Sequence, residues 1–105
     1  PDIVYIGGIT EMKKVCTMAE AYQVKIAPHN TKGPIGIMAA AHVMGSSPNA
    51  LIQEMMAPDV IPWRNNILKN PLKLENSCLV IEDRPGLGIE FDEEEFKQHL
   101  SNSIK

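Results

Sequence analysis

The stretch VKIAPHNTKGPIGIMAAAHVM, residues 24–44, combines a short apolar segment with a helical one. Residues 24–27 are predicted to form a strand that ends at Pro28-His29-Asn30. After a short loop, Pro34 stands where proline is favoured, at the first position of a helix over residues 34–44. The alanines of this helix allow it to pack closely on a sheet. These residues therefore predict one β-α unit, a strand followed by a helix.

The same unit is repeated on the N-terminal side, and a further strand follows. Residues 2–6 are predicted to form a strand, and Thr10 is the expected N-cap of a helix over residues 11–22. Residues 50–53 are the third expected strand, which ends at Glu54. This β-α-β-α-β order predicts an α/β fold with a parallel sheet and right-handed crossovers. Because parallel sheets need both faces covered, we expect this half of the chain to be a slice of a larger fold.

The second half of the chain differs in character. Prolines are expected to interrupt any long helix there: Pro58, Pro62 and Pro71. A strand is predicted over residues 77–81 and a turn over residues 84–88. Asp92 is the expected N-cap of a final helix, with Phe96 and Leu100 on its buried side.

Composition restricts the class of function. The net charge is −3 and no basic patch is visible, so nothing in the sequence favours nucleic-acid binding. No apolar run reaches the roughly 18 residues that a membrane-spanning helix needs. Cys16 and Cys78 have no metal-binding or redox spacing, and we expect them to be reduced thiols in a cytoplasmic protein.

Three residues able to act as acid, base or ligand stand at the predicted strand ends: Asp2, His29 and Glu54. Taken singly, each has a simpler explanation: an exposed carboxylate near the terminus, a loop histidine bonded to the backbone, and a surface glutamate. Taken together, they place one such side chain at an end of each predicted strand. The C-terminal strand ends of a parallel barrel are where active sites are built.

These residues lie in motifs that resemble a known family. Residues 1–10, PDIVYIGGIT, resemble the sixth-strand signature of the mandelate racemase subgroup of the enolase superfamily. Residues 27–30 and 33–35 resemble the seventh-strand signature of its sugar-acid dehydratases. His29 follows Asp2 by 27 residues and Glu54 follows His29 by 25, as in galactonate- and gluconate-dehydratase-like members. Residues 84–90, RPGLGIE, resemble the C-terminal tail of that family.

The resemblance implies a division of the chain. Residues 1–68 would be strands six to eight of a (β/α)₈ TIM barrel with their helices. Residues 69–105 would be a C-terminal tail with one strand and a final helix. In the family this tail packs beside an N-terminal capping domain, which these 105 residues do not include.

The resemblance also implies roles for the site residues. His29 would be the general base that removes the proton alpha to a substrate carboxylate, and Asp2 would fix its tautomer and orientation. Glu54 would hydrogen-bond a substrate carboxylate oxygen as the enediolate forms, and it could donate only when protonated. Lys32, in the following loop, is a weaker candidate for contact with an anionic substrate.

Members of the superfamily stabilise the enediolate with Mg²⁺. Their three acidic ligands lie on the third to fifth strands, so we expect no metal site in this chain and no turnover by it alone. The expected partners are a small sugar-acid substrate and the remaining barrel and capping domain, from the same or another chain. A homo-oligomer is also expected. We expect the acidic run at residues 92–95 to favour the start of a helix rather than a cation.

Several functions remain open at this point. The preferred one is elimination of water from an aldonate such as galactonate or gluconate, giving a 2-keto-3-deoxy sugar acid. A racemase or epimerase would use the same Asp–His base. Two further alternatives are a non-catalytic binding or assembly module, and a fragment completed by another chain. For Trp63-Arg64 three roles are open: shaping the rim of the site, a subunit contact, or core or surface packing.

Overall fold

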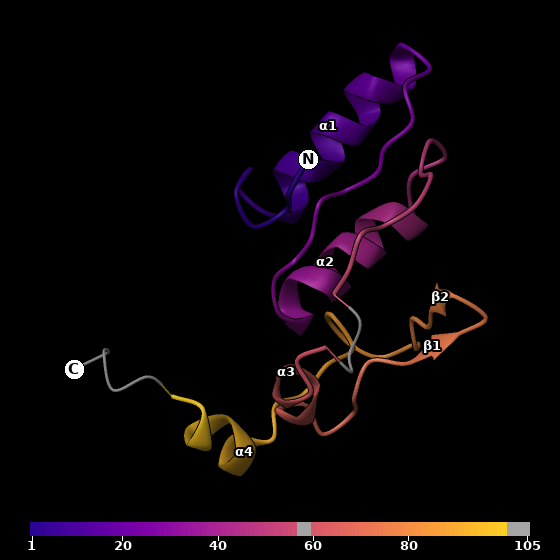
Figure 1. Ribbon diagram of the computed structural model, residues 1–105. Helices are drawn as coiled ribbons and strands as arrows, with labels where there is room; N and C mark the ends of the chain where they lie inside the picture. The colour runs from indigo at the N-terminus through magenta and orange to yellow at the C-terminus, as the bar shows by residue number, and fades with distance from the viewer. Residues whose placement is uncertain (57–59, 101–105) are drawn as a thin grey trace.

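A computed structural model describes residues 1–56 and 60–100 of the chain. Its helices and strands, in chain order, are α1 (Ile9–Ala21), α2 (Pro34–Gly45), α3 (Trp63–Asn66), β1 (Leu74–Glu75), β2 (Cys78–Leu79) and α4 (Glu93–Gln98). Figure 1 shows α1 and α2 in one half of the molecule, and α3, the β1–β2 hairpin and α4 in the other. Pro58 and the last five residues of the predicted tail lie outside the described residues.

Helix α1 confirms the predicted helix, although it begins earlier. Gly7 and Gly8 have φ angles of 103° and 90°, a conformation that glycine adopts without strain, and Gly8 is the N-cap. The expectation that Thr10 caps the helix is therefore wrong. At the other end Gln23 has a φ of 57°, and the N–H of Val24 donates to the Ala19 carbonyl at 2.9 Å. The left-handed conformation of Gln23 and this backbone hydrogen bond together form a Schellman-type helix end.

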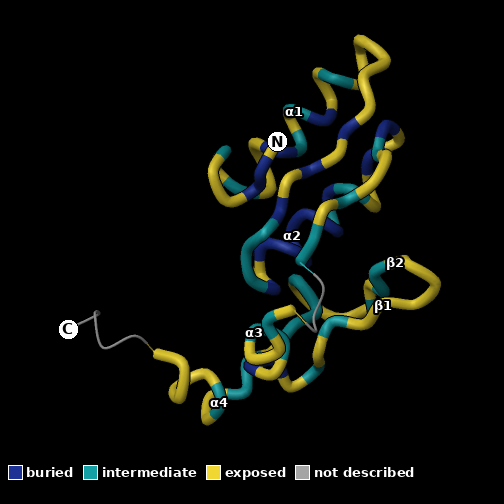
Figure 2. Tube along the Cα trace, in the orientation of Figure 1, coloured by how far each residue is buried: buried dark blue, intermediate teal, exposed yellow. Residues whose placement is uncertain are grey.

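Helix α2 has Pro34 as its first residue, as predicted, and is buried on most of its surface. It packs against α1, and the two helices close over the main core, shown in dark blue in Figure 2. The buried members of this core come from α1, α2 and the segments before and between them: Ile3, Met12, Cys16, Ile26, Ala39, Ala40 and Val43. The small side chains of α2 permit this close approach.

The strand predicted over residues 2–6 is wrong, because residues 3–7 form turns. The side-chain Oδ1 of Asp2 accepts the Val4 N–H at 2.9 Å. The backbone carbonyl oxygen of Asp2 also accepts the N–H groups of Tyr5 and Ile6, at 3.1 and 3.0 Å. A short acidic side chain that bonds its own backbone competes with strand pairing. This local chemistry outweighs the β propensity of the apolar residues.

The other two predicted strands run parallel, as expected, but are reduced to one bridge between Ile26 and Ala50. The Ile26 N–H donates to Asn49 O, and the Leu51 N–H donates to Ile26 O, both at 2.9 Å. Pro28 has no N–H to continue the ladder, although its carbonyl still accepts the Glu54 N–H at 3.1 Å. Within the described residues the predicted three-stranded parallel sheet is therefore not formed.

The second half contains a hairpin that the sequence revealed only in part. The strand predicted over residues 77–81 is shortened to β2, and its antiparallel partner β1 was not predicted. Asn76 and Ser77 connect them with φ angles of 50° and 63°, which suit a two-residue hairpin turn. The short α3 follows Pro62, and Leu68 forms an antiparallel bridge with Phe91.

Helix α4 confirms the prediction of Asp92 as N-cap, since its side chain accepts the N–H groups of Glu94 and Glu95. The expectation that Phe96 and Leu100 are buried is wrong, because they are 41% and 52% exposed. This helix is only six residues long, and the Phe96 ring is tilted by 52° against that of Phe91, with ring centroids 5.2 Å apart.

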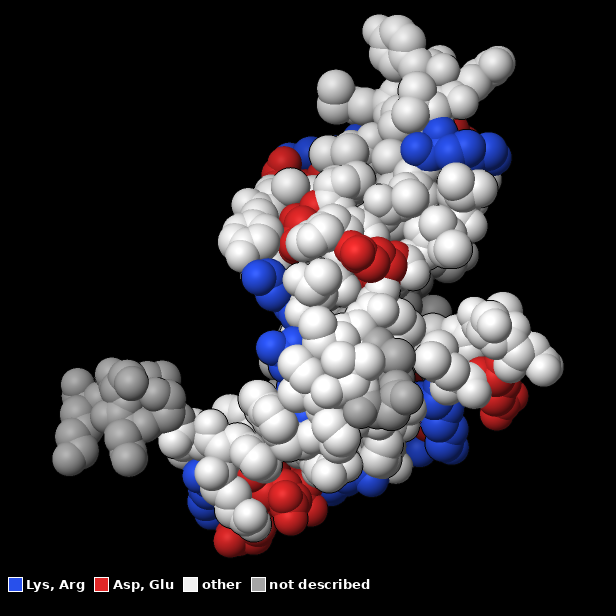
Figure 3. All heavy atoms as spheres, viewed as in Figure 1, with Lys and Arg blue, Asp and Glu red and all other residues white. Residues whose placement is uncertain are grey.

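The surface and the cysteines are unexceptional. Figure 3 shows basic and acidic side chains interspersed on the face in view. No helix in the described part of the chain is long and apolar enough to cross a membrane. Cys16 is buried in the core and Cys78 is exposed on the hairpin, and both are free thiols.

Candidate active site

His29 and Asp2 are in direct contact. The segment that carries His29 alternates, with Pro28 and Asn30 buried against the helices and His29 projecting to the other side. The Nδ1 atom of His29 lies 2.8 Å from Oδ2 of Asp2, and the His29 N–H donates to the Pro1 carbonyl at 2.9 Å. The Asp2 side chain is 9% exposed, whereas that of His29 is 54% exposed.

The electrostatics of this pair favour an ionised Asp2. The hydrogen bond with His29 holds the pKa of Asp2 below its ordinary value of 3.8, against burial, which raises it. The Val4 N–H further lowers the pKa of Asp2. Because a carboxylate can only accept, Nδ1 of a neutral His29 ring carries the hydrogen. Nε2, on the exposed side of the ring, is left with its lone pair.

Glu54 approaches the same histidine from the neighbouring segment. Its Oε2 lies 3.7 Å from Nε2 of His29 and accepts the backbone N–H of Asn30 at 3.1 Å. Its side chain is 53% exposed. A hollow beside these two residues is lined by Ala27, Pro28, His29, Ile52, Gln53 and Glu54. Asp2, His29 and Glu54 are therefore brought together, with the histidine between the two carboxylates.

Asn30, which sequence reasoning did not single out, is completely buried. Its Oδ1 accepts the Lys32 N–H at 3.1 Å, while its Nδ2 has no hydrogen-bond partner among the residues that the structure describes. Gly36 of α2 lies directly against it, since a Cβ there would be 3.5 Å from Nδ2. Asn30 thus fixes the path of the loop that follows His29. Its position directly after the histidine was the only hint in the sequence.

Lys32 lies in the loop, away from direct contact with the dyad. Its Nζ sits 5.0 Å from the centre of the Tyr5 ring. The nearby Tyr5 side chain raises the pKa of Lys32 above its ordinary value of 10.5. Arg64 of α3 also reaches this loop, where it donates to the Thr31 carbonyl at 3.1 Å. Two cationic side chains therefore border the loop.

The other two histidines lie elsewhere. Nε2 of His42 lies 3.3 Å from the Leu87 carbonyl and links α2 to the tail. His99 stacks on Trp63, with ring centroids 4.7 Å apart. Both contacts are explained by packing.

A metal ion does not fit the acidic groups of this site. Over residues 1–56 and 60–100, no group of three or more His, Cys, Asp or Glu side chains lies close enough together to hold one. Both oxygens of Asp2 are engaged, one by Val4 and one by His29, and one oxygen of Glu54 is engaged by Asn30. The geometry suits a histidine base held by a carboxylate.

Residues 1–95 match the family described as enolase C-terminal domain-like. The chain belongs to this family. The resemblance noted in the sequence is thus confirmed at the family level.

Curated relatives of this enolase-type domain carry dehydratase names. One is a D-galactonate dehydratase from Cronobacter sakazakii, 39% identical over 102 residues, which cover 90% of this chain and 26% of the relative. Another is a D-xylonate dehydratase from Haloferax volcanii, 32% identical over 100 residues, or 95% of this chain and 24% of the relative. The chain spans about a quarter of the length of these relatives.

Solved structures agree on the fold. A putative galactarate dehydratase from Agrobacterium radiobacter, with bound sodium and L-malate, is 30% identical with a TM-score of 0.81 over 93% of this chain and 28% of that one. A putative L-alanine-DL-glutamate epimerase from Burkholderia xenovorans, bound to magnesium and fumarate, is 29% identical with a TM-score of 0.76. It covers 88% of this chain and 23% of that one. The described structure is therefore a fragment of the larger mandelate racemase-type fold.

Proposed function

We propose that this chain is the C-terminal part of an acid-sugar dehydratase, a lyase that removes water from an aldonate such as galactonate or gluconate. Residues 1–68 would supply the C-terminal slice of a (β/α)₈ barrel. Residues 69–105 would form the tail beside a capping domain. The dehydratase names of the curated relatives support this class of reaction.

The 2.8 Å contact between Asp2 and His29 carries the proposal. An ionised Asp2 keeps the hydrogen on Nδ1, so the lone pair of Nε2 faces the exposed side, where a substrate has access. His29 takes the proton alpha to the substrate carboxylate onto this nitrogen. The β-hydroxyl would then leave as water with a proton from an acid outside these 105 residues, which yields the enol of a 2-keto-3-deoxy acid that tautomerises to the product.

Glu54 would act on the substrate carboxylate. Its Oε2 already accepts the Asn30 N–H, so the proposed donor to the substrate is Oε1 in its protonated form. A donor positioned where charge develops in the transition state is worth about 2.7–4 kcal/mol in the oxyanion hole of an acyl-transfer enzyme. Lys32 remains a weaker proposed contact for an anionic substrate.

The other components of the enzyme would come from outside these 105 residues. Magnesium, the metal of the superfamily, would be held by acidic residues that this chain does not carry. The rest of the barrel and the capping domain, from the same or another polypeptide, would complete the site. We further propose a homo-oligomer in the cytoplasm.

The test uses the polypeptide that joins residues 1–105 to the remaining barrel. Incubation with galactonate or gluconate and Mg²⁺ is expected to give the 2-keto-3-deoxy acid, and His29→Asn is expected to abolish it. The 105-residue chain alone is expected to give no product. Product from the isolated chain, or full activity in His29→Asn, would contradict the proposal.

Deuterium exchange separates the dehydratase from the alternatives. In D₂O, a racemase or epimerase would exchange the alpha hydrogen of its substrate without forming a keto acid. A binding or assembly module would show neither reaction. The dehydratase is expected to form the keto acid, and an elution volume would show whether a second chain is required.

A further inference from the structure

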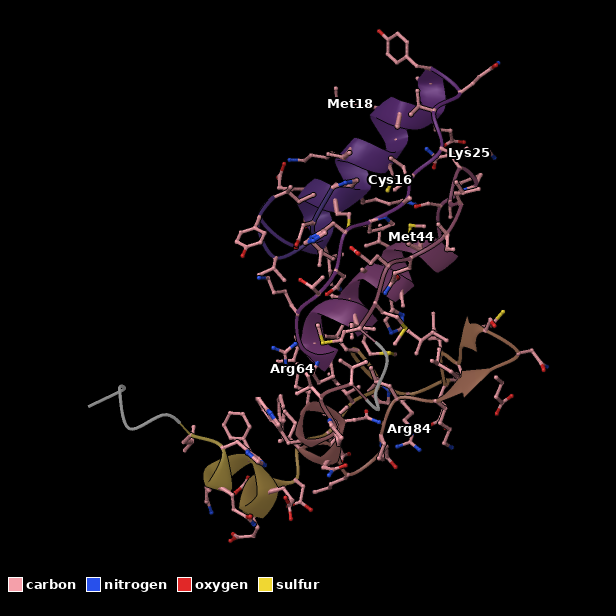
Figure 4. The ribbon with its side chains drawn as sticks, in the orientation of Figure 1. Cys16, Met18, Lys25, Met44, Arg64 and Arg84 are labelled. Carbon is pink, nitrogen blue, oxygen red and sulfur yellow. The ribbon has the colours of Figure 1, made fainter. Side chains whose placement is uncertain are left out.

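Arg64 belongs to α3 and lies near the N-terminal end of α2 (Figure 4). Its Nη1 donates to the Thr31 carbonyl at 3.1 Å and lies 3.8 Å from Sδ of Met56. The side chain is partly buried, and its guanidinium carbon lies 5.9 Å from the centre of the Trp63 ring. A single nitrogen of Arg64 thus contacts two separate loops.

These two loops are the ones that follow the proposed site residues. Thr31 comes two residues after His29, and Met56 comes two residues after Glu54. The loops are also joined at the site, where the Asn30 N–H donates to Oε2 of Glu54 at 3.1 Å. Arg64 therefore forms a second link between the same two segments, farther along each segment from His29 and Glu54.

Helix α3 is held firmly enough to make this connection effective. Oδ1 of Asn65 accepts the Leu72 N–H at 2.8 Å, and the Ile67 carbonyl accepts the Asp92 N–H at 2.8 Å. Ile67 and Leu68, which follow α3, are buried. The arginine thus extends from an element that is anchored on the C-terminal side of its own position.

We propose that Arg64 is a positioning residue that sets the separation of His29 and Glu54. The effect of Arg64 on catalysis rests on the proposed function. Its structural role does not, because Arg64 joins the two loops whatever the reaction is. Arginine suits the task, since its rigid fork of donors bonds a carbonyl while its stem packs on apolar neighbours. Without the Arg64 bond, the loops are expected to separate and the bond between Asn30 and Glu54 to open.

The first test needs no catalysis. Amide hydrogen exchange is measured by NMR in the 105-residue chain and in Arg64→Met. Exchange at Asn30 is expected to be about tenfold faster in the variant, as for loss of a hydrogen bond to a charged group. Exchange at Cys16, inside α1, is expected to be unchanged. An equal change at both amides, or no change at Asn30, overturns the proposal.

Two further variants sharpen this measurement. Arg64→Lys keeps the charge and one donor, and it is expected to give a smaller acceleration at Asn30. It also serves if Arg64→Met does not fold. Arg84→Met is the matched control, because Arg84 belongs to the tail and pairs with Glu82 at 2.6 Å. It is expected to leave Asn30 exchange unchanged, and an effect as large as that of Arg64→Met overturns the proposal.

The second test uses the complete polypeptide with its substrate. Arg64→Met is expected to lower kcat by about tenfold or more, with KM within about twofold, because misplaced groups slow the chemical step. A KM increase with unchanged kcat overturns the positioning role. Absence of dehydration in the unsubstituted enzyme refutes the proposed function, while the exchange measurement still decides the role of Arg64.

Discussion

Asp2 and His29, 27 residues apart in sequence, meet at 2.8 Å with the carboxylate shielded and the imidazole open to solvent. The buried Asp2 therefore determines the tautomer of the exposed His29 ring. Asp2 also closes a turn with Val4 through its other oxygen. One side chain thus shapes the backbone and orients the proposed base, and the two roles can be separated by mutation.

Asp2→Asn is expected to preserve the turn while it disables the base. The amide oxygen can still accept the Val4 N–H, but the amide nitrogen would donate to Nδ1 and place the ring hydrogen on Nε2. In the complete polypeptide, kcat is expected to fall by roughly 10⁴-fold, as for the wrong histidine tautomer in other enzymes. Nitrogen NMR of the 105-residue chain would report the tautomer. The exposed Asp83→Asn is the control, and an unchanged tautomer in Asp2→Asn would refute the argument.

The Asp2–His29 pair should also give the fold a pH dependence. Because the pKa of Asp2 is lowered in the folded chain, the unfolded chain binds more protons in acid. The stabilisation is present above about pH 4 and is lost as the pH falls through the folded pKa. Urea unfolding from pH 7 to pH 2.5 should show a steeper loss of stability for the natural chain than for Asp2→Asn. Parallel plots of stability against pH for the two chains would contradict a stabilising role of ionised Asp2.

Gly36→Ala tests the packing of α2 on the loop after His29. The added Cβ would lie 3.2 Å from Cγ2 of Val4 and 3.5 Å from Nδ2 of Asn30. Overpacking costs about 1–3 kcal/mol, and the better helix propensity of alanine offsets at most about 1 kcal/mol. A net loss of stability of about 1 kcal/mol is expected in urea unfolding.

Gly45→Ala is the matched control for that substitution. It lies at the other end of α2, where a Cβ would meet only Cδ1 of Ile81 at 3.7 Å, an ordinary contact. Its stability is expected to be unchanged or slightly higher. Equal effects of the two substitutions would show that the proximity of Gly36 to Val4 and Asn30 has no energetic consequence.

Lys13 and Lys14 offer a second matched pair. Nζ of Lys13 reaches from α1 to the end of α2, where it donates to the Ser46 carbonyl at 2.6 Å and to Oγ of Ser47 at 3.1 Å. Lys13→Met is expected to lower the free energy of unfolding by about 1–2 kcal/mol. Among the described residues Lys14 pairs only with the exposed Glu11, so Lys14→Met should change the free energy of unfolding by less than about 0.5 kcal/mol. A reversed order would contradict this account.

Helices α1, α2 and α4 were predictable because their determinants are local, whereas the four-residue α3 was not predicted. The apolar spacing of α1, the proline that begins α2 and the aspartate that caps α4 all act within a few residues. Strands depend on partners elsewhere, so the segment at residues 2–6 was misassigned when the Asp2 side chain bonded its own backbone. The hairpin strand β1 was missed because its two residues are exposed and carry no alternating pattern.

The candidate site was accessible from the sequence for a different reason. Asp2, His29 and Glu54 were linked by motif order and spacing, which a resemblance to a family makes informative. Arg64 was not assigned to the site beyond its rim, because its bond to Thr31 joins residues 33 apart and leaves no local pattern. Asn30 escaped notice because burial cannot be read from a polar residue in a loop.

The two cysteines allow the rate at which α1 and α2 separate to be measured by thiol labelling. Cys16 is 1% exposed beneath α2, whereas Cys78 is exposed at the tip of the hairpin. A thiol reagent should therefore label Cys78 at once and Cys16 only when the helices part, because a buried thiol is inert. The slow phase of one labelling reaction then measures how often α1 and α2 separate, with the fast phase as its own reference.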